Sequence, residues 1–286
     1  MFSIIGILVV FGAVVGGYLM EKGHILVLMQ PAELVIIAGA AMGTVLVANP
    51  THILKEIAAG LGSVFGSEKY SRKRYAELLQ MMFQVFNQVR RGGWPAVEAD
   101  IEEPAKSKVF SAYPAVLGDH HVLNFVCDSL RTAALGAVDP FDLDQMMELD
   151  MDAHHHAAGQ PVAALSTMAD SLPGLGIVAA VLGVVKTMSH IAEPPAVLGA
   201  MIGSALVGTF LGVLLAYGIA GPCANRIKGV VEEESQYFEV IRAVLVAHLQ
   251  GNAPQVSVET GRKMAPTQHM PSFAELESAV QNLQIG

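Results

Sequence analysis

The sequence has little charge, almost no cysteine and none of the common nucleotide-binding motifs. Only 15% of its 286 residues are Asp, Glu, Lys or Arg, whereas a soluble domain carries about 25%. Two cysteines are too few for a disulfide-stabilised secreted domain. Neither GxxxxGK[ST] nor GxGxxG occurs, and a net charge of −9 disfavours nucleic acid as a partner.

Charge is missing altogether from four long runs, which are residues 1–20, 34–54, 171–185 and 194–225. A helix needs about 20 apolar residues to cross a bilayer. The runs therefore predict an all-α integral membrane protein with four transmembrane helices. These spans lie near residues 2–20, 32–50, 171–191 and 196–220, and the third is the weakest because Lys186 interrupts it.

The charged segments between and after the spans show a helical pattern and no strand pattern. Apolar residues recur near period 3.6 from residue 71 to 90 and again from 120 to 135. We expect an acidic helix from Pro140 to the histidine run at 154–156 and a turn-rich stretch at 252–269. A last short helix should run from Phe273 to Leu283, capped by Ser272. The predicted domains are a transmembrane hairpin at 1–50, a cytoplasmic helical domain at 51–168, a second hairpin at 169–222 and a cytoplasmic helical extension and tail at 223–286.

Orientation follows from the cations. Fifteen of the seventeen Lys and Arg residues lie at 51–168 or after Pro222, and only Lys22 and Lys186 lie in the short hairpin connections. Cytoplasmic segments carry the excess of cations, so we expect both termini inside. The first span has no cationic stretch before it, which favours a retained span over a cleaved signal peptide.

The apolar cores contain no ionisable residue of their own. Glu33 and Asp170 lie at span edges, where we interpret them as interfacial anchors or helix N-terminal charges. Ionisable groups inside a membrane usually mark an ion pathway. If this protein moves ions, its titrating carboxylate is therefore expected to come from another chain.

Small residues and two prolines mark the spans. GxxxG spacings occur four times within the spans, and such small faces favour close helix packing and oligomers. Pro173 and Pro222 lie at the cytoplasmic ends of spans three and four, where they could form a hinge or could simply mark span boundaries. The glycine pairs are Gly12 and Gly16, Gly39 and Gly43, Gly199 and Gly203, and Gly208 and Gly212.

The run ALVGTFLGVL at 205–214, followed by Pro222, resembles the signature of the MotA-type flagellar stator subunits. Further segments that resemble this family are GGYLMEKG at 16–23, QPAELVIIAGAAMG at 30–43 and SLPGLGIVAAVLGVV at 171–185. The resemblance covers essentially the whole chain.

The resemblance implies a rotary-motor component of the bacterial inner membrane and not an enzyme. Such subunits form a ring, a pentamer, around a dimer of a MotB-type partner that is anchored to peptidoglycan and supplies the titrating Asp. Together they form a proton channel and convert proton-motive force into torque on a rotor switch protein of the FliG type. The resemblance implies that no cofactor is needed and that the transported ion is H⁺.

The resemblance also implies roles for individual residues. Sodium-driven relatives carry a threonine where Ala180 stands, and Ala180 has no oxygen with which to bind a hard cation, so proton coupling is favoured. Arg90 and Glu98 are the implied rotor contacts, in a region where 55–91 carries net +4 and 98–152 carries net −9. The possible conformational hinge at Pro173 and Pro222 rests on the positions of the prolines and not on the resemblance. The residues expected to face the channel are Gly176, Ala180, Gly183, Thr209 and Gly212.

Two alternatives stay open from the sequence. An ExbB/TolQ-like energiser of envelope processes resembles the channel helices but has three spans, and a scaffold could oligomerise through glycine faces without moving ions. The histidine run at 154–156 is interpreted as a solvated loop without metal, and Cys127 and Cys223 as packing thiols.

Overall fold

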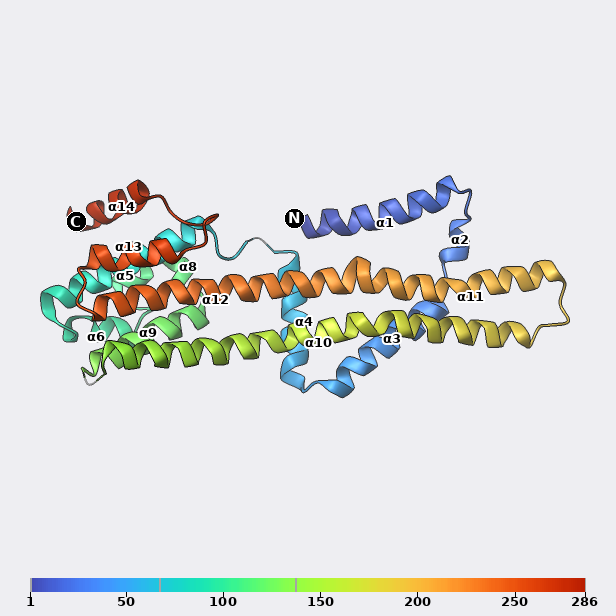
Figure 1. Cartoon of the computed structure of the whole chain (residues 1–286), viewed down its shortest axis with the longest axis horizontal. Coiled ribbons are helices and arrows are strands. Elements are labelled where there is room, and N and C mark those ends of the chain that lie inside the picture. The colour runs from blue at the N-terminus through green and yellow to red at the C-terminus, as the bar shows by residue number, and fades with distance from the viewer. Residues whose placement is uncertain (1, 67, 137, 286) are drawn as a thin grey trace. The chain divides into compact units, whose positions relative to one another are not determined.

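Helices make up most of the part of the chain that the structure describes. The computed structural model describes residues 2–66, 68–136 and 138–285 and contains no strand among them. The predicted domains also include residues 1, 67, 137 and 286, which lie outside the described residues. Figure 1 shows helices joined by short connections. The all-α class predicted from the sequence is confirmed.

Within the described residues, four helices are long and apolar enough to cross a membrane, as predicted. The first is α1 (Phe2–Met20), and a short helix α2 (Ile25–Leu28) leads to the second, α3 (Pro31–Ala48). The third span lies in α10 (Pro140–Met188). The fourth begins with α11 (Pro195–Leu215) and continues through a π-helical segment, η1 (Ala216–Ala220), into α12 (Gly221–Leu249). The predicted extension of the fourth span beyond Pro222 is confirmed.

The third span belongs to a helix much longer than the sequence pattern predicts. We expected an acidic helix to end near the histidine run at 154–156, but α10 continues unbroken for 49 residues, through Pro161 and Pro173. Gly159 lies in its interior without the positive φ that would end a helix. Burial of apolar side chains beyond the histidines, such as Leu165, stabilises the continuation.

The end of the chain contains a second difference. The stretch at 252–269, which we expected to be turn-rich, contains the helix α13 (Pro254–Met264). Its Gly261 has a packing function, because a Cβ there would overlap with the Val244 side chain. The predicted start of α14 (Phe273–Ile285) is confirmed. The Ser272 hydroxyl accepts from the Glu275 N–H at 3.2 Å, and the Glu275 carboxylate accepts from the Ser272 N–H at 2.8 Å, which is a capping box.

The chain divides into two compact units. The span unit comprises Met1–Ser67 and Ala158–Val230, and the second unit comprises Glu68–Ala157 and Val231–Gly286. Both α10 and α12 contribute residues to each unit. The span unit includes α4 (Thr51–Val64), which the sequence assigned to the domain at 51–168. A Cβ on Gly60 of α4 would lie 3.1 Å from Cδ1 of Ile227, so α4 packs closely within the span unit.

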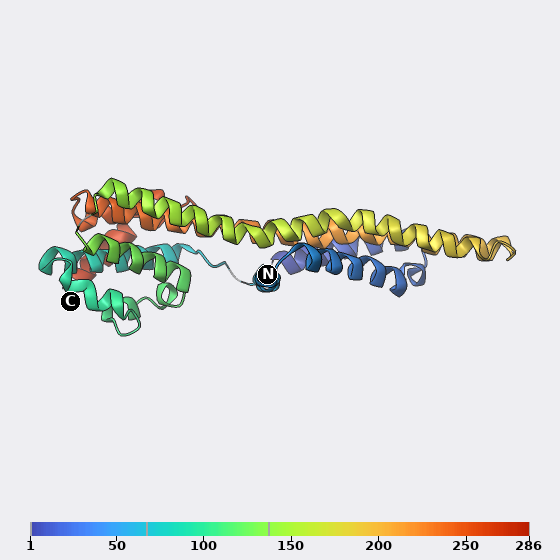
Figure 2. The ribbon, with the colours of Figure 1, turned by 90° about the horizontal axis from the view of Figure 1, so that it is seen from below.

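The second unit is built around α5 (Arg72–Gly92). This helix packs against α6 (Pro95–Glu102), α7 (Lys108–Ser111), α8 (Pro114–Leu117) and α13, and α6 in turn packs against α9 (His120–Ala134). Figure 2 shows these cyan and green helices beside the green start of α10. The apolar face predicted for 71–90 forms the core. Its fully buried side chains are Tyr75, Leu78, Leu79, Met81, Met82, Phe83, Val85 and Phe86.

Candidate functional site

The closest helix contact in the span unit joins α10 and α11 through glycines. A Cβ on Gly176 of α10 would lie 2.8 Å from the Gly208 carbonyl oxygen and 3.0 Å from Cα of Gly212. A Cβ on Gly212 would lie 2.6 Å from the Leu172 carbonyl oxygen. Real side chains do not approach backbone this closely, so only glycine fits. Figure 1 shows the two helices side by side.

The predicted channel-facing residues are distributed over this contact. Gly176 and Gly212 lie inside it. Gly183 faces Ala205, because a Cβ added at Gly183 would lie 2.6 Å from the Ala205 Cβ. The structure thus gives these three glycines a packing function within one chain. That they also face an ion path stays a prediction.

The two remaining members of that set are Ala180 and Thr209. Ala180 is buried, whereas Thr209 is half-buried on α11. Among the described residues, the Thr209 hydroxyl has no hydrogen-bond partner, although threonine in a helix commonly bonds the carbonyl one turn earlier. The Thr187 hydroxyl of α10 donates to the carbonyl four residues earlier at 2.9 Å, and the Thr44 hydroxyl of α3 donates to the carbonyl three residues earlier at 2.8 Å. Thr209 therefore leaves a hydroxyl available to a ligand or another chain.

Glu33 lies among the spans. It occupies the first turn of α3, as a helix N-terminal charge would, but its side chain is 8% exposed and is not an interfacial anchor. Glu33 therefore fits the helix N-terminal charge of the two sequence interpretations, and the interpretation as an interfacial anchor is wrong. Asp170, by contrast, is exposed on α10. The signal available in the sequence was the position of Glu33 directly before a long apolar run. Only the packing of α3 against α10 and α11 buries it.

Three of the four GxxxG pairs face open space within the chain. A Cβ on any of their six glycines would meet nothing within 4 Å. Only the fourth pair, Gly208 and Gly212, is used in contacts inside the chain. The open pairs lie on α1, α3 and α11, and α1 has no buried residue at all. Small open faces on spans suit packing against further helices.

The two predicted hinge prolines lie within long helices. Pro173 is inside α10 and half-buried, and Pro222 is exposed in the first turn of α12. Directly before Pro222, η1 carries a π-type hydrogen bond from the Gly221 N–H to the Ala216 carbonyl, five residues earlier. Such bulges occur where a helix is bent or strained. The hinge function stays a prediction.

The predicted rotor contacts lie on either side of one turn in the second unit. Arg90 is in the last turn of α5 and Glu98 in the first turn of α6, and both are exposed. Gly93, with φ of 72°, makes the turn between the helices. No ion pair involves Arg90 or Glu98 among the described residues. Both charges are thus open to an external partner.

The histidine run is helical, so its interpretation as a solvated loop is wrong. His154, His155 and His156 lie within α10, and His154 is half-buried. Its Nε2 lies 3.4 Å from the carboxylate of Glu234, which also accepts a 2.8 Å hydrogen bond from the Tyr70 hydroxyl. Because α10 continues past the run, the three side chains point in different directions. Only His154 belongs to a packed charged cluster, whereas His155 and His156 are exposed, so the three do not form a common site.

Cysteines and metal-ligand clusters add no further site. Cys127 and Cys223 are free and buried. Burial raises the pKa of the Cys127 thiol to about 12, so it is not a reactive thiolate. Among the described residues, no three His, Cys, Asp or Glu side chains are arranged to hold a metal ion.

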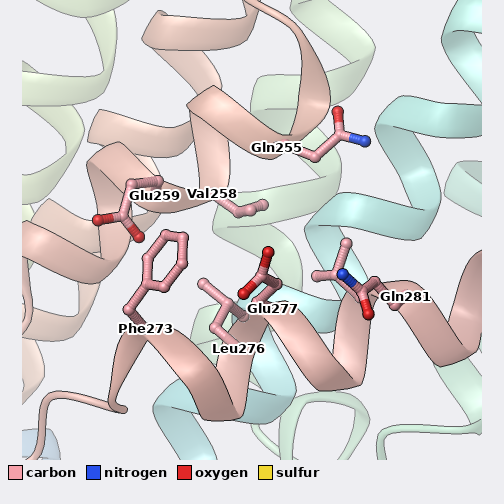
Figure 3. A pocket seen from close by; sticks show the side chains of 8 residues that line it. Gln255, Val258, Glu259, Phe273, Leu276, Glu277 and Gln281 are labelled. Carbon is pink, nitrogen blue, oxygen red and sulfur yellow. The ribbon is translucent and has the colours of Figure 1, made fainter.

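A surface pocket of about 210 Å³ lies between α13 and α14 (Figure 3). Val258 and Leu276 form its apolar wall, and Glu259 and Glu277 lie at its edges. The Glu259 carboxylate is already paired with Arg262 at 2.7 Å, which lowers the Glu259 pKa. The pocket therefore offers no concentration of unpaired charge for an ion.

Two protein-family models match the chain. The model for the motility protein A N-terminal region matches residues 4–93, and the model for the MotA/TolQ/ExbB proton channel family matches residues 119–240. The motility protein A of Escherichia coli is 40% identical over 280 residues, which are 98% of this chain and 95% of that protein.

Two solved structures are similar over nearly their full length. The flagellar MotAB stator complex from Bacillus subtilis contains a chain that matches with a TM-score of 0.74 and 25% identity, covering 96% of this chain and 98% of that one. The MotAB structure from C. jejuni matches with a TM-score of 0.75 at 17% identity, covering 95% and 98%. The second likeness concerns the fold alone.

Proposed function

This chain belongs to the MotA family of flagellar stator subunits, and we propose that with a MotB-type partner it forms a proton channel and converts proton-motive force into torque on the flagellar rotor. The resemblance noted in the sequence is thereby confirmed. The family model that covers both N-terminal spans is the one specific to motility protein A. An ExbB/TolQ-like energiser lacks this pair of N-terminal spans, so the function of a stator subunit is preferred.

The observation that carries the proposal is the glycine-mediated contact of α10 and α11. The signature run at 205–214 places Gly208 and Gly212 at this contact, and no other residue fits there. The same run carries Thr209, whose hydroxyl has no hydrogen bond within the described residues. Two closely packed helices with one free hydroxyl form a surface on which a partner's Asp could exchange a proton.

The proposed ion is H⁺. Ala180, buried on α10, contributes no side-chain oxygen, and a dehydrated Na⁺ would need several oxygen ligands. In this proposal Thr209 supplies the hydroxyl nearest the partner's Asp. No cofactor takes part, and the chain catalyses no covalent reaction.

The assembly that we propose is a pentamer around a dimer of the peptidoglycan-anchored partner. The three open GxxxG faces on α1, α3 and α11 supply surfaces for neighbouring helices. The protein is a multi-pass inner-membrane protein. We propose that both termini are cytoplasmic, because fifteen of the seventeen Lys and Arg residues lie in segments on the same side of the spans as the termini. The second unit then contacts a rotor protein of the FliG type.

The proposed function is tested in cells that lack their own stator subunit. Co-expression of this chain with a MotB-type partner is expected to restore swimming, and rotation at fixed membrane potential should continue when sodium is removed. Expression of the chain without the partner is the control and should leave cells non-motile. Loss of torque on sodium removal would exclude proton coupling, and failure to restore motility with any MotB-type partner would exclude the function.

Arg90→Glu is expected to impair rotation while leaving membrane insertion unchanged. The reason is that Arg90 is exposed, has no ion pair within the described residues and would meet an acidic rotor surface. Opposite charge reversal on the rotor should partly restore swimming, measured as swarm diameter. Lys108→Glu, which reverses another cation of the second unit, serves as the control. If no rotor charge reversal restores motility, Arg90 is a structural charge only.

A further inference from the structure

The Glu33 carboxylate lies in a space that is open because two neighbouring residues are glycines without side chains. Its Oε2 atom would lie 2.9 Å from a Cβ on Gly208, and its Oε1 atom 3.8 Å from a Cβ on Gly183. A Cβ at Gly208 would force the carboxylate, which is the end of a flexible side chain, to shift from this position. Gly208 of α11 thus has two functions. It leaves room for the Glu33 carboxylate, and it allows close approach to Ala179 and Ala180 of α10.

The Glu33 carboxylate in this space has no partner that would compensate its charge. Oε2 is buried and makes no hydrogen bond within the described residues. The group also forms no ion pair there, although Lys186 lines the same cavity. An unpaired carboxylate in an apolar environment is costly, because it loses its hydration without gaining a counter-charge. Taking up a proton removes that cost.

A cavity gives the carboxyl group access to water-sized molecules. It measures about 320 Å³ and lies between α3, α10 and α11. The side chain of Gln30 at its edge donates to the Ser204 hydroxyl at 3.0 Å, and the Thr187 hydroxyl donates to the Gly183 carbonyl at 2.9 Å. Lys186 is the other titratable group in the lining, and α11 contributes none.

The lining fits a proton better than a metal cation. A cation such as Na⁺ would need several oxygen ligands, whereas besides Glu33 the side chains of the lining offer only the oxygens of Gln30, Ser204 and Thr187, and Lys186 adds positive charge. A proton needs only the carboxylate and a water molecule to bring it. The cavity lies where α10 ends and α11 begins, which is the outer side in the proposed orientation.

We propose that the Glu33 carboxyl group is a proton-binding site of this chain, which takes up protons from the cavity before they reach the partner's Asp. The carboxylate accepts a proton from a hydronium ion, which leaves water, and later releases it to a water molecule that leads toward the partner's Asp, so the group returns to its first state. This inference rests on the proposed function, because it adds a step to that proton path.

The first test uses the wild-type complex with its partner in membranes. N,N′-dicyclohexylcarbodiimide reacts with protonated carboxyl groups in apolar surroundings, and mass spectrometry locates the product. We expect modification of Glu33 and none of Glu21, an exposed carboxylate in the neighbouring hairpin connection. Absence of label on Glu33 would overturn the proposal without the need for any variant.

The second test measures rotation against external pH at fixed membrane potential. Glu33→Gln keeps the shape and removes the titrating group, so we expect loss of rotation or a speed that no longer follows the wild-type pH profile. Glu33→Asp should retain a proton-dependent speed, and the control Glu21→Gln should match the wild type. Wild-type rotation by Glu33→Gln at every external pH would overturn the proposal.

The two tests separate this proposal from the proposed function. If the wild-type complex drives no rotation, the proposed function fails whatever happens at Glu33. If the wild type rotates while Glu33→Gln behaves identically, only the inference about Glu33 fails. Should Glu33→Gln not reach the membrane, labelling of the wild type and the pH profile of Glu33→Asp decide the question.

Discussion

Gly212→Val is expected to abolish motility and to lower the thermal stability of the purified complex. A Cβ at Gly212 would lie 2.6 Å from the Leu172 carbonyl oxygen and 2.8 Å from Cα of Gly176. Both atoms belong to backbone, so no side-chain rotation relieves the collision and α10 must move away from α11. Overpacking of a well-packed core costs about 1–3 kcal/mol, and occasionally more, and backbone contact places this change at the upper end or beyond.

The control for this prediction is Gly159→Ala in α10. A Cβ at Gly159 meets nothing within 4 Å, and alanine favours a helix over glycine by about 1 kcal/mol. Its melting temperature should therefore equal or exceed that of the wild type. Gly212→Ala should fall between Gly212→Val and the wild type. A Gly212→Val complex that melts and rotates like the wild type would show that α10 and α11 do not depend on this close contact.

Pro222→Ala and Pro173→Ala are expected to weaken or abolish torque while leaving membrane insertion intact. Proline has no N–H, so the carbonyl four residues before Pro222 lacks its usual helical donor. The π-helical segment η1 directly precedes this site. Alanine restores the donor and favours a regular α-helix, which stiffens a place where the helix could bend. Torque is measured from the rotation of tethered cells at equal levels of membrane-inserted protein.

Pro195→Ala is the matched control for the prolines. Pro195 is the first residue of α11, where an N–H has no partner within the helix in any case. This variant should therefore rotate normally. Normal swimming of both Pro173→Ala and Pro222→Ala would refute the hinge and leave the prolines as markers of span boundaries.

Local patterns predicted the elements that depend on local physics. The start of α14 was predictable because Ser272 and Glu275 form a capping box by themselves. The apolar face of α5 was predictable because its period matches a helix with one buried side. By contrast, α13 was not predictable, because Gly261 resembles a loop residue until Val244 packs against it. The continuation of α10 past its histidines likewise depends on side chains buried by other helices.

The candidate site divides in the same way. The sequence alone determined the four spans and the family, because apolar length and the run at 205–214 are properties of the chain itself. Tertiary structure alone decided that Gly176 and Gly212 face each other, and that Gly183 and Gly208 leave room for Glu33. The reason is that burial of a carboxylate is set by what neighbouring helices place around it. No pattern along α3 contains that information, since the glycines that receive Glu33 lie on α10 and α11.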